Sequence, residues 1–225
     1  MPALGQLPSL KHLVIEWFSR LEIVGSEFCG DQYSSSVTCF KSLTSLKFRG
    51  LSVCKAWSTD QADVSPFPCL EELYMLDCPQ LTQGFPLELP SLKVLHMERC
   101  SVFSGSLSCS PLLRELTLRD CEMADLTNLA KLTRLTSLSY SAQYVLAVDQ
   151  GAVVAAAIPL LTSIDRLTLK GIPLPLRHFP VLSVVRSLSL DHVSDARSVA
   201  SHLADSWLII SQPCPFMNAA LLRPY

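Results

Sequence analysis

The fold is decided by a phrase that occurs twice, as LPSLKHLVIE at residues 7–16 and as LPSLKVLHME at residues 89–98. Seven of the ten positions are identical between the two copies. Internal repetition of this kind is typical of proteins built by stacking one structural unit many times. The shared part has the form Leu-x-x-Leu-x-apolar, and this form recurs along much of the chain.

Eight copies of this core occur in succession. Their middle residues are separated by 33, 27, 22, 21, 22, 29 and 21 positions, and four of these steps are 21 or 22. Steps of 20–29 residues are typical of leucine-rich repeats, so the pattern indicates a leucine-rich-repeat array. The framework residues are Leu10/Leu13/Ile15, Leu43/Leu46/Phe48, Leu70/Leu73/Met75, Leu92/Leu95/Met97, Leu113/Leu116/Leu118, Leu135/Leu138/Tyr140, Ile164/Leu167/Leu169 and Val185/Leu188/Leu190.

Each core predicts a short strand with one buried face. Successive side chains of a strand point to opposite faces, so Leu13 and Ile15 face the core while Val14 faces outward. Stacked repeats place these strands side by side in a parallel sheet, which the return half of each repeat must cover. We therefore expect an α/β solenoid, a leucine-rich-repeat horseshoe with the sheet on its concave face and an irregular or helical convex side. The apolar residues expected in the return segments are Leu51, Leu81, Phe103, Leu126, Leu129 and Ile172.

The pattern divides the chain into an array of about eight repeats at residues 1–193 and a capping region at 194–225. Val199, Leu203, Trp207 and Ile210 follow at helical spacing, which predicts a terminal helix over residues 195–210, with an irregular tail after it. A second helix is expected on the convex side within residues 141–160. No polar capping repeat precedes the first copy, so the sequence is expected to be part of a longer array or a truncated product.

Composition excludes several classes of partner. The net charge is -2 and the pI about 6.2, which argues against nucleic acid and anionic membrane surfaces. The longest apolar run, residues 152–161, is about half the length of a membrane span. The nine cysteines form no CxxC pair, and no Asn-x-Ser/Thr site occurs. Together with the lack of a signal peptide, these features favour a reducing, cytoplasmic location.

Four stretches carry a resemblance to a known family. They are PALGQLPSLK at residues 2–11, VGSEFCG at 24–30, FPCLEELYMLDCPQL at 67–81 and LPSLK at 89–93. They resemble repeat phrases of plant intracellular nucleotide-binding leucine-rich-repeat (NLR) disease resistance proteins of the coiled-coil class. The likeness is close over residues 1–100, weaker to residue 193 and absent from the tail.

The resemblance implies a role in innate immunity. In such receptors the repeat region senses a pathogen effector, or a host protein modified by one, and restrains the nucleotide-binding switch domain. This chain has no GxxxxGK[ST] phosphate loop, because none of its eight glycines is followed by lysine. The resemblance therefore does not imply nucleotide binding or death signalling for this chain. It does imply protein sensing and autoinhibition.

The outward strand positions are the expected partner-binding surface, because the curvature of a solenoid makes this face concave. Tyr74, His96 and Arg119 are the strongest candidate anchors, since aromatic and arginine side chains dominate protein interfaces. The alternative is that this face is only a solvated sheet surface. The candidate partner-binding residues are Trp17, Arg49, Glu72, Tyr74, His96, Glu98, Arg119 and Lys170.

Cys78, Cys100 and Cys121 occupy one repeat position, each five residues after a strand leucine. Neighbouring coils should bring them roughly 5 Å apart at the backbone. That distance permits a disulfide, and a straight stack does not make a tetrahedral zinc site. The favoured interpretation is buried, reduced structural cysteines.

No catalytic, cofactor-binding or metal-binding constellation is found, so we expect a binding protein and not an enzyme. The five histidines show no HExxH or HxxxH pairing, and no GxSxG elbow or paired-carboxylate motif occurs. Two alternatives to an immune sensor remain. A ubiquitin-ligase substrate adaptor would need an F-box-like segment before the array, and a non-functional truncated fragment would be insoluble when expressed.

Overall fold

The structure is a computed structural model, and it describes a regular set of short strands. Described are residues 4–24, 28, 39–57, 67–82, 89–100, 110–121, 129, 131–142, 154, 156–172 and 184–191, and the backbone alone of 207–211 and 220–221. The elements are η1 (Leu4–Gln6), β1 (His12–Glu16), β2 (Ile23–Val24), β3 (Ser45–Arg49), β4 (Ala56–Trp57), β5 (Glu72–Leu76), β6 (Val94–Glu98), β7 (Glu115–Arg119), β8 (Ser137–Ser141), η5 (Ile158–Leu160), β9 (Arg166–Lys170), β10 (Ser187–Asp191), β11 (Trp207–Ser211) and β12 (Ala220–Leu221).

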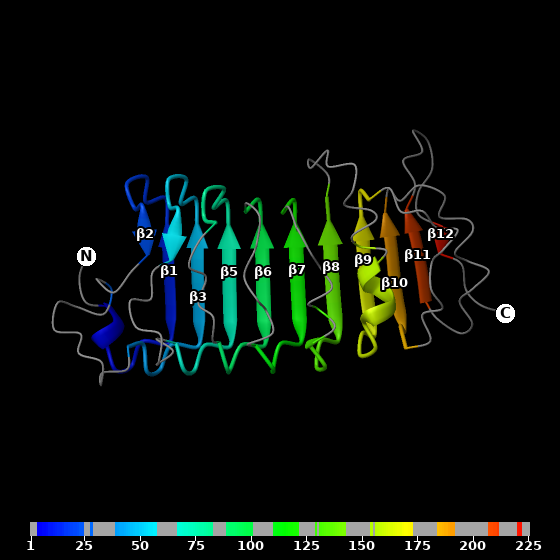
Figure 1. Cartoon of the computed structure of the whole chain (residues 1–225), viewed down its shortest axis with the longest axis horizontal. Helices are drawn as coiled ribbons and strands as arrows, with labels where there is room; N and C mark the ends of the chain where they lie inside the picture. The colour runs from blue at the N-terminus through cyan, green and yellow to red at the C-terminus, as the bar shows by residue number, and fades with distance from the viewer. Residues whose placement is uncertain are drawn as a thin grey trace.

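All eight predicted copies form strands of one parallel sheet. The strands lie in the order β1-β3-β5-β6-β7-β8-β9-β10, and β11 and β12 extend the sheet. Figure 1 shows the long strands standing side by side in chain order. The pairing joins equivalent repeat positions, so that Leu46 lies beside Leu73 and Leu73 beside Leu95. The predicted leucine-rich-repeat solenoid with a parallel sheet is confirmed.

Alternation along each strand separates core from surface. In β5, Leu73 and Met75 are buried, while Glu72, Tyr74 and Leu76 are partly exposed. Because the apolar side chains occupy alternate positions, one face of the sheet is buried and only the other contacts water. The burial of this apolar face drives the stacking of repeats. We call the half-exposed face the open face.

The turn before each strand explains the Leu-Pro-Ser-Leu phrase. The N–H of Leu92 donates to the carbonyl of Leu89 at 3.2 Å, which closes a turn with Pro90 at its second position. Proline favours this position because its ring presets the backbone angle φ. Ser91 then donates to the carbonyl of Pro68 in the preceding coil at 2.7 Å. The phrase therefore both forms the turn and ties one coil to the next.

Most strands end in a left-handed residue that continues the ladder between coils. The N–H of each such residue donates to the carbonyl of the last residue of the next strand at 2.7–2.9 Å. A single left-handed residue thus bends the chain without losing its hydrogen bond. These residues are Trp17, Gly50, Asp77, Arg99, Asp120 and Gly171.

The return segments cover the inner face of the sheet. In the first two coils they form a second parallel sheet of β2 and β4, with Val24 and Trp57 buried. Trp57 packs edge-on against Phe48 and Phe67, with ring centroids 5.1 and 5.5 Å apart. The predicted return-segment residues Leu51, Leu81, Leu129 and Ile172 are buried, and Phe103 and Leu126 lie outside the described residues.

The predicted convex-side helix is seen only at its end. Residues 154, 156 and 157 are helical, η5 follows, and Val154, Ala157 and Ile158 are buried. The remainder of residues 141–160 belongs to β8 or lies outside the described residues, apart from Ala142. No described helix is long and apolar enough to cross a membrane.

The predicted terminal helix over residues 195–210 is wrong at its end. Residues 207–211 form β11, which pairs in parallel with β10, and β12 pairs antiparallel with β11 within the expected irregular tail. The run Trp207-Leu-Ile-Ile is short, apolar and partly β-branched, which suits a strand beside an exposed sheet edge. Residues 195–206 of the prediction lie outside the described residues.

Candidate functional site

The open face carries three straight rows of side chains, from the first, third and fifth positions of each strand. Because pairing is in register, each row runs across all the coils. The first row is His12, Ser45, Glu72, Val94, Glu115, Ser137, Arg166 and Ser187. The second is Val14, Lys47, Tyr74, His96, Thr117, Ser139, Thr168 and Ser189. The third is Glu16, Arg49, Leu76, Glu98, Arg119, Ser141, Lys170 and Asp191.

The centre of the second row holds two rings in contact. Tyr74 on β5 lies beside His96 on β6, with ring centroids 6.0 Å apart and planes tilted by 36°. The carboxylate of Glu72 lies beside Tyr74, since its Oε2 accepts from Ser45 Oγ at 3.2 Å and from Tyr74 Oη at 3.5 Å. Glu72 is therefore held by hydroxyl groups.

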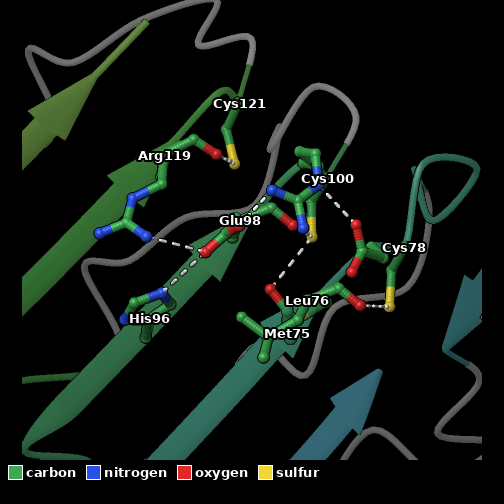
Figure 2. Close-up of polar contacts among 10 residues, drawn as sticks. Met75, Leu76, Cys78, His96, Glu98, Cys100, Arg119 and Cys121 are labelled. Atoms are coloured by element: carbon green, nitrogen blue, oxygen red, sulfur yellow. Dashed lines mark hydrogen bonds and ion pairs between the residues drawn. The ribbon is translucent and has the colours of Figure 1, made fainter. Parts of the chain in front are cut away.

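Glu98 connects His96, at the centre of the open face, to Arg99, the residue that follows the end of β6. Its Oε2 lies 3.2 Å from Arg119 Nη1 and 3.8 Å from His96 Nε2, and its Oε1 contacts Arg99. Figure 2 shows the Glu98 carboxylate between His96 and Arg119. The structure thus brings together five of the predicted residues, Glu72, Tyr74, His96, Glu98 and Arg119. We call these five residues the central cluster.

Partial burial sets the protonation of the two rings. Burial, and after it the positive charge of Arg119, lowers the pKa of His96 below its usual value of 6.5, while Glu98 acts in the opposite direction. Burial, with the nearby Glu72 carboxylate, raises the pKa of Tyr74 above 10. Near pH 7 the ring pair is therefore uncharged, and it offers an amphipathic surface with polar edges.

A second pair, Trp17 and Arg49, lies at the β1 end of the face. The guanidinium carbon of Arg49 is 5.4 Å from the centre of the Trp17 ring, a cation–π distance. Trp17 is 64% exposed, and its backbone φ is 61°. A bulky residue with positive φ is uncommon and costs conformational energy.

Lys170, the last predicted residue, stands apart from both groups. It lies on β9, with β8 between it and Arg119. Its Nζ pairs with Asp191 Oδ2 on β10 at 2.7 Å. The eight predicted residues therefore form a central cluster, an end pair and an isolated ion pair.

Sequence reasoning missed the charged residues at the strand exits. Arg99 Nε lies 2.5 Å from Asp77 Oδ1, and both residues have positive φ. The hydrogen bond from Arg99 lowers the pKa of Asp77. Alternation along a strand says nothing about the residue after it, so only alignment of the repeats at their strand ends could have found this pair.

The predicted cysteine stack is present as free thiols. Cys78, Cys100 and Cys121 are buried, and each thiol donates to a carbonyl at the end of its own strand, at 3.4–3.5 Å. Figure 2 shows the three sulfur atoms beyond the strand ends. Hydrogen bonds with the thiols of Cys121 and Cys78, and then burial, raise the pKa of Cys100. Among the described residues, no group of three or more side chains is arranged to hold a metal.

The remaining described cysteines divide into two kinds. Cys54 and Cys69 are also free, and Cys69 is exposed. Cys39 is disulfide-bonded. The five free thiols agree with a reducing compartment and the Cys39 bond does not, because disulfides are rare in the cytosol.

Comparison with known proteins relates half of this chain to disease resistance proteins. The chain is 37% identical over 117 residues to a protein of Arabidopsis thaliana named as disease resistance protein At3g14460; the match covers 52% of this chain. It is 37% identical over 108 residues, 45% of this chain, to an Arabidopsis thaliana protein named as disease resistance RPP13-like protein 1. The matched regions are 8% and 10% of these relatives' lengths. No protein-family model matches.

The expected likeness to plant disease resistance proteins is thus confirmed at the level of sequence similarity. Both relatives are named as disease resistance proteins, and the similarity spans about half of this chain. Because the chain corresponds to a small part of each relative, the activities and partners of those whole proteins are matters for proposal.

Proposed function

We propose that this chain is a protein-recognition module of the plant defence response. In this proposal it corresponds to part of the leucine-rich-repeat region of an intracellular NLR disease resistance protein, and the open face binds the partner. Two lines of support meet here. One is the similarity to two disease resistance proteins. The other is a row of polar and aromatic side chains that parallel pairing holds in register.

The central cluster is the observation that carries the proposal. Aromatic and arginine residues supply most of the binding energy of protein interfaces, and prearranged side chains lose less entropy on binding. Tyr74 and His96 are held by their mutual contact, and Arg119 by Glu98. A merely solvated face does not need rings and charges fixed in this way.

The partner in this proposal is a protein. It is a pathogen effector, a host protein modified by one, or the nucleotide-binding switch domain of a longer parent chain. We place the module in the cytoplasm and assign it no catalytic role. The free thiols of the cysteine stack support that compartment, whereas the Cys39 disulfide does not.

Affinity purification from infected and healthy leaf tissue tests the proposal. The bait is the full chain, compared with a variant carrying Tyr74→Ala, His96→Ala and Arg119→Ala. A control carries Lys131→Ala and Arg134→Ala, two exposed residues on the turn before β8. Quantitative mass spectrometry should find proteins that the wild type and the control retain and the open-face variant loses at least tenfold.

Equal recovery by all three baits would count against recognition through the open face. If only the Lys131→Ala and Arg134→Ala variant lost its bound proteins, the binding surface would lie on the side of the solenoid where the turns precede the strands. Circular dichroism of each bait confirms that the substitutions leave the fold intact.

A further inference from the structure

Arg49 differs from the other cations of the open face in its electrostatic environment. On the described strands, the other lysines and arginines of this face each lie within 3.2 Å of a carboxylate: Lys47 with Glu16, Arg119 with Glu98, Arg166 with Glu115 and Lys170 with Asp191. Among the described residues, Arg49 forms no ion pair with a carboxylate, and its Nε is buried without a hydrogen-bond partner.

The residues beside Arg49 explain why it is left without a carboxylate partner. Its register neighbours are Glu16 and Leu76. Glu16 is committed to Lys47 at 3.1 Å, and Leu76 has no charge. Asp77, whose pKa the Arg49 charge also lowers, is hydrogen-bonded to Arg99 at 2.5 Å. Each nearby carboxylate is thus already engaged.

Trp17 positions this free cation from one side. Its indole lies against Gly50, where a Cβ would come within 2.3 Å of Trp17 Cε3, and 5.4 Å from the Arg49 guanidinium carbon. Val14 on the edge strand β1 is 56% exposed, and Trp17, directly after β1, is 64% exposed. A fixed arginine next to exposed apolar side chains matches the composition of an interface anchor.

We propose that Trp17 and Arg49 anchor an acidic segment of the protein partner. A carboxylate of the partner accepts hydrogen bonds from the Arg49 guanidinium, and an apolar neighbour packs on the Trp17 indole and Val14. The inference rests on the proposed protein-binding function and names the chemistry of the partner. A nucleic-acid backbone fits less well, because the nearest open-face lysine, Lys47, is neutralised by Glu16.

A random dodecamer peptide library displayed on phage supplies the probe. Peptides are selected on the full wild-type chain, synthesised with a fluorescent label and measured by anisotropy. We expect the selected peptides to share an Asp or Glu next to an apolar residue. Asp→Asn in the peptide, or Arg49→Gln in the chain, should weaken binding at least tenfold. The two changes together should weaken it little further.

Variants of the chain separate charge from stacking and from misfolding. Arg49→Lys should keep part of the affinity, and Trp17→Ala should lose most of it. Arg114→Gln, the same kind of change at an exposed arginine before β7, should leave the affinity unchanged. Replacing the peptide Asp by phosphoserine tests whether any anion is accepted; a stronger dependence on phosphate than on carboxylate would overturn the assignment.

Failure of this inference is distinguishable from failure of the proposed function. Peptides that lose affinity with Tyr74→Ala but not with Arg49→Gln overturn the acidic anchor and leave open-face binding intact. Strictly additive losses in the Arg49→Gln and Asp→Asn cycle also overturn the anchor, because they show no direct contact. If no peptide is enriched, the anchor is overturned, and the leaf purification decides the wider function by itself.

Discussion

The indole of Trp17 lies so close to Gly50 that a Cβ added to the glycine would come within 2.3 Å of Trp17 Cε3. Both residues follow the end of a strand and both have positive φ, 61° for Trp17 and 66° for Gly50. The close approach lets the Trp17 ring lie across the backbone of the next coil. Glycine at residue 50 is therefore what places the exposed indole beside Arg49.

Gly50→Ala should destabilise the chain and displace Trp17. The alanine meets the indole and also has to adopt a left-handed backbone, which together cost about 2 kcal/mol in the free energy of unfolding. Urea denaturation followed by circular dichroism gives the change. The same substitution in a Trp17→Ala background should cost about 1 kcal/mol, because the clash is absent. Equal costs in both backgrounds would show that the ring does not rest on Gly50.

Two leucines at one repeat position should differ in their contribution to stability. Leu95 on β6 is 0% exposed, whereas its equivalent Leu13 on the edge strand β1 is only partly buried. Leu95→Ala should therefore cost about 3 kcal/mol in unfolding free energy, and Leu13→Ala about half of that. Similar losses in urea melts would indicate that the first coil is covered as fully as the inner ones.

The free energy of unfolding should decrease as the pH is lowered, because His96 becomes protonated. Its pKa is lowered in the folded state, mainly by burial, so the unfolded chain binds the proton more tightly. The contribution is complete above about pH 6.5 and is lost as pH falls towards the folded pKa. His96→Gln should make the difference in unfolding free energy between pH 7.5 and pH 5.5 smaller. A difference that stays the same would contradict the lowered pKa.

The cysteines should react in an order set by burial. Cys69 is exposed, so iodoacetamide should label it in the native protein, while Cys78, Cys100 and Cys121 should be labelled only after unfolding. Peptide mapping by mass spectrometry after a short pulse gives the extent at each site. Rapid native labelling of Cys100 would show that the stack of thiols is open to solvent.

The sheet could be predicted from sequence because its framework is periodic. Leu13, Leu46 and their equivalents recur at spacings that only a stack of strands satisfies, and period-2 alternation assigns the two faces. The terminal strand β11 could not be predicted in this way. Its apolar residues also fit a helical stripe with Val199 and Leu203, and short apolar runs do not distinguish the two structures.

The candidate site could be predicted as a face but not as a set of contacts. Alternation places Tyr74, His96 and Arg119 outward, yet it does not reveal that Glu98 links two of them. The pair of Arg166 and Glu115 is a further example, because it spans the whole of β8 at 3.2 Å. Long side chains reach over the small Ser137 between them, and such reach depends on register as well as on sequence.

The exit residues show a second limit of sequence reasoning. Arg99 and Trp17 adopt positive φ although glycine, asparagine and aspartate are the usual residues there. Their conformation is imposed by the ladder between coils, in which the Arg99 N–H donates to Arg119 O at 2.9 Å and the Trp17 N–H to Arg49 O at 2.8 Å. Tertiary hydrogen bonding thus overrides the local preference of the residue.

Site-specific photo-crosslinking tests the central claim, recognition through the open face, most directly. A benzophenone amino acid is placed at residue 74 or 96 on the open face, or at residue 131 on the exposed turn before β8, and the chain is irradiated in leaf extract. We predict that positions 74 and 96 crosslink to the same partner protein and that position 131 does not. Crosslinks from position 131 alone, or equal crosslinks from all three positions, would contradict recognition through the open face.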